Sequence, residues 1–126
     1  MREIIFIGVA GLVGTLGRYW ISGMFDQKFG PAFPVGTLVV NLLGCFLAGV
    51  LFYSVTERYV VDPAIRSALL VGFLGAFTTF SAFGIQTFTL LRDGQMALAI
   101  LNMALSNAAG LLLVWAGYSL SRMFTM

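Results

Sequence analysis

Histidine is absent from this sequence, and cysteine occurs only once, at Cys45. Without an imidazole, the chain lacks the commonest metal ligand and the side chain best suited to proton transfer near neutral pH. A single thiol can form neither an intrachain disulfide nor a thiolate metal cluster. Because no nucleophile–base pair is visible either, we do not expect an enzyme.

Charged residues are also scarce, at 10% of the 126 residues, whereas 60% are hydrophobic. A soluble domain of this size could not bury so much apolar surface. The net charge of +2 is small and no basic stripe is present, so we expect no nucleic-acid partner. The composition, including 15 glycines that suit close helix packing in lipid, predicts an integral membrane protein.

Four stretches are long and apolar enough to cross a bilayer, which takes about 20 residues in a helix. They predict an all-α membrane protein with a single transmembrane domain over 1–126. The first stretch is long and has no small-residue cleavage site, so we expect it to be retained and not removed as a signal peptide. The expected helices cover roughly 4–24, 35–55, 65–91 and 95–124.

Short connections with helix-breaking residues separate these helices. Pro31 and Pro34 interrupt the first connection. Asp62 and Pro63 predict an N-cap followed by a first-turn proline at the start of the third helix. A tight turn over 92–94 leads into the fourth helix. These connections leave no room for a soluble domain.

Positive charge is nearly balanced between the two ends of the predicted bundle. One end carries Arg2, Arg58, Arg66 and Arg122, and the other carries Lys28, Arg92 and Arg18. Such a weak bias is compatible with one fixed orientation or with insertion both ways up. In the second case, two opposed copies can form an antiparallel dimer. Four short helices enclose little space, so a pore would need a second subunit.

Polar side chains within the apolar stretches are informative, because an unsatisfied polar group in hydrocarbon costs several kcal/mol. Asn41 either bonds a neighbouring helix or lines a polar track. Arg18 suits snorkelling or dimer packing better than direct ligand contact, and Ser106 can bond back to its own helix. None of the five acids lies deep in a stretch, where a cation- or proton-coupled transporter normally has a carboxylate. The polar inventory therefore favours an anion or a neutral solute.

The third stretch places Thr78, Thr79 and Ser81 within four residues, with glycines on both sides. Threonine and serine compete for backbone hydrogen bonds, so a helix interrupted between Gly75 and Ser81 is one hypothesis. An intact helix with hydroxyls bonded to the preceding turn is the other. A break at membrane depth must be buried or line a cavity, and freed carbonyls there commonly coordinate a cation.

Phenylalanines are interleaved with these hydroxyls. Phe77, Phe80 and Phe83 are spaced by three and so lie near one another on a helix. Ordinary packing explains most such stripes. Because a ring has a positive edge and a negative face, edges turned toward a pathway would attract a small anion, whereas faces would attract a cation.

Three motifs match those of one known family. They are Gly14 through Arg18-Tyr19, the run GTLVVNLLG over 36–44, and the pattern Gly72-x-x-Gly75-x-x-Thr78-Thr79-Phe80-Ser81-x-Phe83. With the length and the layout of four helices, the chain resembles the Fluc (CrcB) family of fluoride channels. The resemblance implies passive, selective export of fluoride across the plasma membrane, the inner membrane in bacteria. It also implies an antiparallel dual-topology homodimer whose third helix is broken mid-membrane, with a structural Na+ at the dimer interface.

The resemblance also assigns residues. The Na+ would be held by the backbone carbonyls of Gly75 and Thr78. Anion-pathway positions are Asn41, Thr79, Phe80, Ser81, Phe83, Gln86 and Ser106, with Arg18 near the vestibule. Ala82 departs from the Ser or Thr common in the motif, and Gln86 stands where many relatives carry Glu, so we expect no role that needs a carboxylate there. Gly110 supplies no hydroxyl one turn beyond Ser106.

Two other membrane functions remain as alternatives. A small dual-topology multidrug-type transporter also has four helices, but it needs an intramembrane carboxylate. A non-transporting assembly subunit would leave the hydroxyls of the third stretch without a function.

Overall fold

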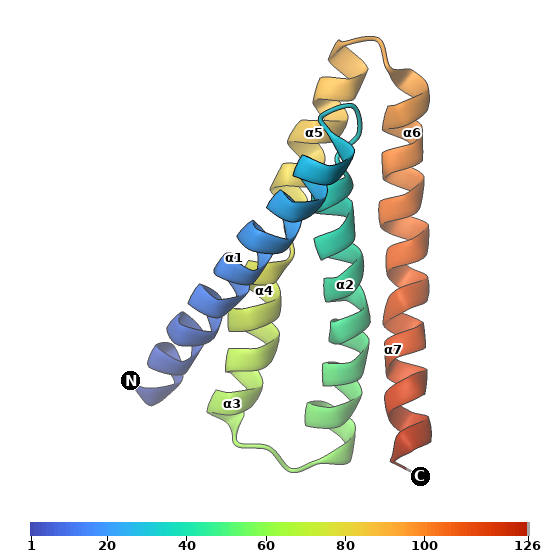
Figure 1. Cartoon of the computed structure of the whole chain (residues 1–126). Coiled ribbons are helices and arrows are strands. Elements are labelled where there is room, and N and C mark those ends of the chain that lie inside the picture. Colours follow the sequence, from blue (N-terminus) through green and yellow to red (C-terminus); the bar gives the residue numbers. More distant parts are fainter. Residues whose placement is uncertain (126) are drawn as a thin grey trace.

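The computed structural model describes residues 1–125, which form a bundle of four long helices (Figure 1). Each is long and apolar enough to cross a membrane, so the expected number of four is confirmed for the described residues and the chain is a multi-pass membrane protein. The first is α1 (Arg2–Phe29), and the second joins α2 (Val35–Phe52) to η1 (Tyr53–Arg58). The third contains α3 (Pro63–Ser67), η2 (Ala68–Phe73), α4 (Leu74–Phe77) and α5 (Phe80–Arg92). The fourth contains α6 (Met96–Ala104), η3 (Leu105–Ala109) and α7 (Gly110–Phe124).

The helix ends follow the local signals in the sequence. Gly30, with φ of 74°, ends α1 in a conformation that favours glycine. The Asp62 side chain accepts a hydrogen bond from the Ala64 N–H, and Pro63 occupies the first turn of α3, as predicted. That bond, together with Arg2, lowers the pKa of the Asp62 carboxyl below its ordinary value. Both termini lie at the same end of the bundle (Figure 1).

The α2 and α7 helices pack so closely that their backbones meet through glycines. A Cβ added to Gly49 would overlap the Val114 carbonyl, and one added to Gly117 would overlap the Phe46 carbonyl. At the other side of the bundle, α1 crosses η2 and α4 obliquely (Figure 1). There, Cβ atoms at Gly14 or Gly72 would meet backbone atoms of the facing helix. Glycine therefore sets the spacing at both main helix contacts.

Gly49→Ala is expected to destabilise the protein by about 1–3 kcal/mol, because a methyl group at this site must push α2 away from α7. Thermal unfolding in detergent measures the effect as a lower Tm. Gly23→Ala is the matched control, since a Cβ at Gly23 has no neighbour within 4 Å. Equal Tm values for the two variants would contradict the close α2–α7 contact.

Three π-helical segments interrupt the helices, which the sequence-based interpretation did not foresee. They are η1, η2 and η3, within the second, third and fourth helices. A π turn widens the helix locally and shifts the direction of the side chains that follow.

Asn102, just before η3, is only 2% exposed and donates to the Thr87 hydroxyl at 2.9 Å. This bond fixes the fourth helix against α5.

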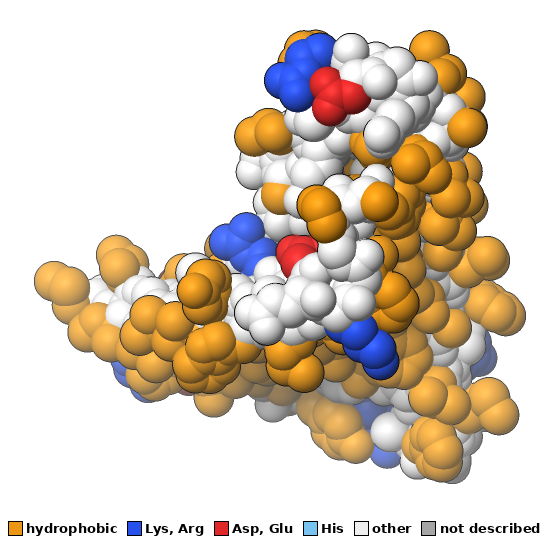
Figure 2. Space-filling view, turned by 45° about the horizontal axis from the view of Figure 1, so that its top comes forward, with side chains coloured by type: hydrophobic (Ala, Val, Ile, Leu, Met, Phe, Trp, Pro, Cys, Tyr) orange, Lys and Arg blue, Asp and Glu red, His pale blue; other side chains and the backbone are white. Residues whose placement is uncertain are grey.

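Few side chains are buried within one copy of the chain. Val40 and Ala99 are fully buried, whereas Trp20, Trp115 and many aliphatic residues are exposed. In Figure 2, hydrophobic side chains are spread over both arms of the molecule, and charged side chains form small separate groups. Such a surface suits lipid or a second protein copy better than water.

Candidate functional site

The third helix is interrupted at Thr78 and Thr79, inside the interval expected from the sequence. Thr78 has φ −92° and ψ 157°, and Thr79 has φ −146° and ψ 115°, so both are extended. The α4 helix therefore ends at Phe77, and α5 begins at Phe80. Two extended residues leave backbone groups without their helical partners, and these groups need others.

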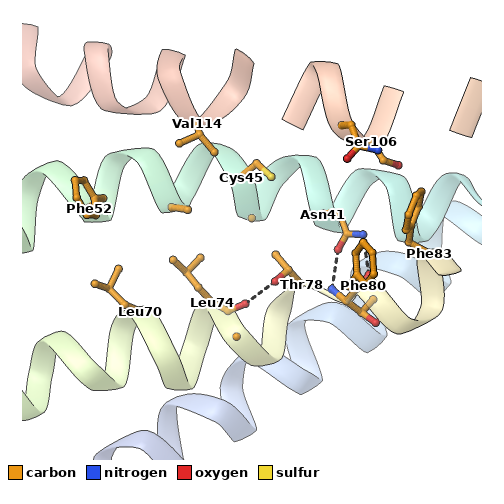
Figure 3. Close-up of a pocket in the computed structure, with 15 residues that line it drawn as sticks. Asn41, Cys45, Phe52, Leu70, Leu74, Thr78, Phe80, Phe83, Ser106 and Val114 are labelled. Carbon is orange, nitrogen blue, oxygen red and sulfur yellow. Dashed lines mark hydrogen bonds between the residues drawn. The ribbon is translucent and has the colours of Figure 1, made fainter. Parts of the chain in front are cut away.

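The Asn41 side chain supplies partners for Thr79 (Figure 3). Its Nδ2 donates to the Thr79 carbonyl at 3.0 Å, and its Oδ1 accepts from the Thr79 N–H at 2.7 Å. One side-chain amide thus satisfies both backbone groups of the extended residue. The interhelical hydrogen bond considered for Asn41 is present, and it holds α2 against the interruption.

Hydroxyl groups complete the two helix ends. Thr78 Oγ1 donates to the Leu74 carbonyl at 2.9 Å, so this hydroxyl bonds back to the preceding turn. Thr79 is the N-cap of α5, where its Oγ1 accepts from the Ala82 N–H at 3.1 Å. The Ser81 hydroxyl lies 3.3 Å from Thr79 Oγ1. The three hydroxyls therefore stabilise the interruption that their sequence pattern suggested.

Two backbone carbonyls lose their usual helical donors at this point. In a continuous α-helix, the Thr79 N–H would bond the Gly75 carbonyl and the Ala82 N–H would bond the Thr78 carbonyl. The first N–H bonds Asn41 instead, and the second bonds the Thr79 hydroxyl. Gly75 is exposed, and a Cβ there would meet nothing within 4 Å. Backbone carbonyls at an interrupted helix are a common kind of ligand for a cation. The described residues contain no cluster of three or more Asp, Glu, His or Cys side chains that could hold a metal ion.

An open pocket of about 660 Å³ lies between α2, the interrupted third helix and the fourth helix (Figure 3). We call it the Asn41 pocket. It contains none of the Asp or Glu side chains of the described residues. Seven of the residues singled out in the sequence line it, namely Asn41, Gly75, Thr78, Thr79, Phe80, Phe83 and Ser106. The structure therefore brings together residues from three helices that are far apart in the sequence.

Phe80 and Phe83 form one wall of the Asn41 pocket. Their ring centroids are 5.4 Å apart and the rings are tilted by 43°, so edges and faces are both presented. Phe80 is 81% exposed, so its ring is not packed in the core of this copy of the chain. Figure 3 shows both rings beside Asn41.

The other three anion-pathway candidates do not line the Asn41 pocket. Arg18 lines a second pocket of about 300 Å³, together with Thr37, and Thr79 lies on the walls of both pockets. Gln86 lines a third pocket, of about 410 Å³. Ser81 is exposed and is connected to the site through Thr79.

Gln86 lines the third pocket, and its side chain is hydrogen-bonded to Thr37, which lines the second. Its Nε2 donates to the Thr37 hydroxyl at 2.8 Å, which crosslinks α5 and α2. Its Oε1 is buried and has no hydrogen-bond partner among the described residues. A buried acceptor without a partner costs free energy, so this oxygen is an energetically unfavourable feature of the link between α5 and α2.

Two further polar side chains of the Asn41 pocket were not predicted from the sequence. Cys45 lines it from α2, and Asn107 lines it from η3. The signal for Asn107 was present, because it is a polar residue next to Ser106 in a largely apolar helix. In a regular α-helix, adjacent residues point in different directions. The sequence therefore did not indicate that Ser106 and Asn107 line the same pocket.

Comparison with known proteins places the chain in one family. The family described as "CrcB-like protein, Camphor Resistance (CrcB)" matches residues 5–118. The chain is 42% identical over 122 residues to a "Fluoride-specific ion channel FluC" of Citrifermentans bemidjiense, covering 97% of this chain and 98% of that protein. Proteins of the same name from Desulforapulum autotrophicum and Nitrosococcus oceani are 44% and 41% identical, over 97% and 96% of this chain and 98% and 97% of the relatives. The chain belongs to the CrcB family.

Proposed function

We propose that the chain is a fluoride-selective channel that lets fluoride leave the cell passively across the bacterial plasma membrane and so lowers cytoplasmic fluoride. The relatives of similar length are named fluoride-specific ion channels, and channels are not enzymes. The observation that carries the proposal is the Asn41 pocket, which combines an amide, hydroxyls and two phenylalanine rings and contains no carboxylate.

The chemistry of this pocket suits a small, strongly hydrated anion. A channel must replace the water around the ion with several donors, each weak enough to let the ion leave again. Hydroxyls, an amide and positive ring edges are donors of that kind. A nearby carboxylate would repel the anion, and the described lining residues include none. The same absence disfavours the multidrug-type alternative, which needs an acid to couple transport to protons.

The working unit in this proposal is an antiparallel dimer with the interruption at mid-membrane depth. The Asn41 pocket is open, and Phe80 stands largely exposed beside it, so one chain supplies only part of an enclosed pathway. The exposed apolar surface of α1 gives a second copy a place to pack. The near balance of positive charge between the two ends permits both orientations.

A structural Na+ fits the carbonyls at the interruption. Gly75 and Thr78 would hold it, because the amides that normally bond their carbonyls have other acceptors. Two oxygens are too few to replace the hydration shell of a cation, so a second copy would supply the others. When bound, the ion would add positive charge near the anion pathway and tie the third helices of the two copies together.

Removal of Na+ is expected to abolish fluoride efflux and to lower the thermal stability of the dimer. Without the cation, the Gly75 and Thr78 carbonyls of the two copies would face one another and repel. The measurement compares purified protein after prolonged dialysis into Na+-free buffer with protein returned to Na+ buffer. An N-methylglucamine salt keeps the ionic strength constant. Undiminished efflux and stability without Na+ would exclude this site.

Growth of bacteria in fluoride tests the proposed function in cells. A strain without its own fluoride export should regain growth in fluoride when it expresses this chain. The same strain expressing Asn41→Asp serves as the control, provided that both proteins reach the membrane in equal amounts. If the wild-type chain inserts and gives no protection, the proposed function is wrong.

A further inference from the structure

The fourth helix turns two consecutive polar side chains, Ser106 and Asn107, toward the Asn41 pocket. In a regular α-helix, neighbouring residues point about 100° apart. Both residues lie within the π segment η3, where more residues share each turn and this angle is smaller. We propose that Asn107 is a second amide donor of the anion pathway, complementing Asn41; this inference rests on the proposed channel function.

The Asn107 amide has a hydrogen available for a ligand. Its Nδ2 donates to the Met103 carbonyl at 2.7 Å, which fixes the side chain against its own helix. An amide nitrogen carries two hydrogens, and this bond uses one of them. The side chain is exposed, so the second hydrogen can reach an anion in the pocket without breaking the bond to Met103.

The packing at Gly110 leaves little room for a donor side chain at that position. Gly110 lies one turn beyond Ser106, where a hydroxyl would continue the polar track of the fourth helix. This glycine is buried, and a Cβ there would approach Cys45 Sγ to 3.3 Å, a tight contact. Asn107 lies three residues before Gly110 and, unlike Gly110, it is exposed and lines the Asn41 pocket. Asn107 is thus a polar residue of the fourth helix, beside Ser106, that can offer a donor to the pocket.

Fluoride efflux from liposomes tests this role, with the wild-type protein as the reference. Asn107→Leu keeps the approximate volume and removes both hydrogens, so efflux should fall about tenfold, the loss expected for one hydrogen bond to an ion. Leu105→Met changes an exposed residue of the same π segment that does not line the Asn41 pocket, and it should leave efflux within about twofold. If the wild-type protein conducts fluoride and Asn107→Leu conducts it at the same rate, the inference is wrong. Without wild-type efflux, the channel function itself fails, and the inference fails with it.

Asn107→Ser separates a pathway role from a purely structural one. A serine at this position can still donate to the Met103 carbonyl, as serines in helices commonly do. It then has no second hydrogen for an anion. If Asn107 only stabilises η3, the serine variant should conduct like the wild type, and that result would also overturn the inference. We expect normal thermal stability together with efflux as low as in Asn107→Leu.

Discussion

Asn41→Asp is expected to reduce fluoride efflux about a hundredfold or more in liposomes. The aspartate retains the acceptor for the Thr79 N–H but cannot donate to the Thr79 carbonyl. It also adds a negative charge to a pocket that contains no other carboxylate among its described lining residues. The aspartate also has no N–H left to donate to an anion. Loss of one hydrogen bond to an ion accounts for roughly a tenfold change, and repulsion between like charges adds to it.

Gln95→Glu provides the control for this substitution. It makes the same amide-to-acid change at an exposed residue before α6, away from the Asn41 pocket. Efflux through this variant should stay within about twofold of the wild-type rate, because an exposed charge is largely screened by salt. Similar efflux through Asn41→Asp and the wild type would show that the Asn41 amide is not part of the pathway.

Phe80→Ile should lower fluoride efflux about tenfold or more while the protein remains folded. Isoleucine keeps an apolar side chain, but it has no positive ring edge to attract an anion. Because Phe80 is 81% exposed within one copy, its loss opens no large cavity in the chain. The measurement is the initial efflux rate per reconstituted dimer.

Phe88→Ile is the matched control for Phe80→Ile. Phe88 belongs to the same helix and is 64% exposed, but it does not line the Asn41 pocket. Its replacement should leave efflux nearly unchanged. If the two variants conduct equally well, the exposed ring of Phe80 has no role beyond packing.

Much of the fold follows from local chemistry that can be read in the sequence. The four apolar stretches predict the four helices, and Asp62 with Pro63 predicts the start of α3. The interruption was also predictable as one of two hypotheses, because Thr78 and Thr79 can use their hydroxyls to bond the adjoining helix ends. Short-range hydrogen bonds of this kind depend only on residues a few positions apart.

Features that depend on contacts between helices could not be predicted in the same way. The choice between an interrupted and an intact third helix depends on Asn41, 38 positions before Thr79. The π segment η3 has no sequence signature of its own, since Ser, Asn and Ala also occur in regular helices, and it changes which side chains reach the Asn41 pocket. Asn107 was therefore missed, although the adjacent Ser106 was identified.

Gln86 illustrates how the structure refines a residue that the sequence had already singled out. The sequence indicated an amide where many relatives have a carboxylate. The structure shows that its nitrogen is bonded to Thr37 and that its buried oxygen has no partner among the described residues. The residue thus lies away from the Asn41 pocket, between two smaller pockets, and links α5 to α2.

Efflux of fluoride and of chloride from liposomes containing the purified wild-type protein tests the central claim most directly. Equal outward gradients of the two anions should give rapid, passive loss of fluoride, with chloride retained as in protein-free liposomes. The process should need neither a proton gradient nor ATP. Folded protein that releases no fluoride, or that releases chloride equally fast, would contradict the assignment of a fluoride-selective pathway to this chain.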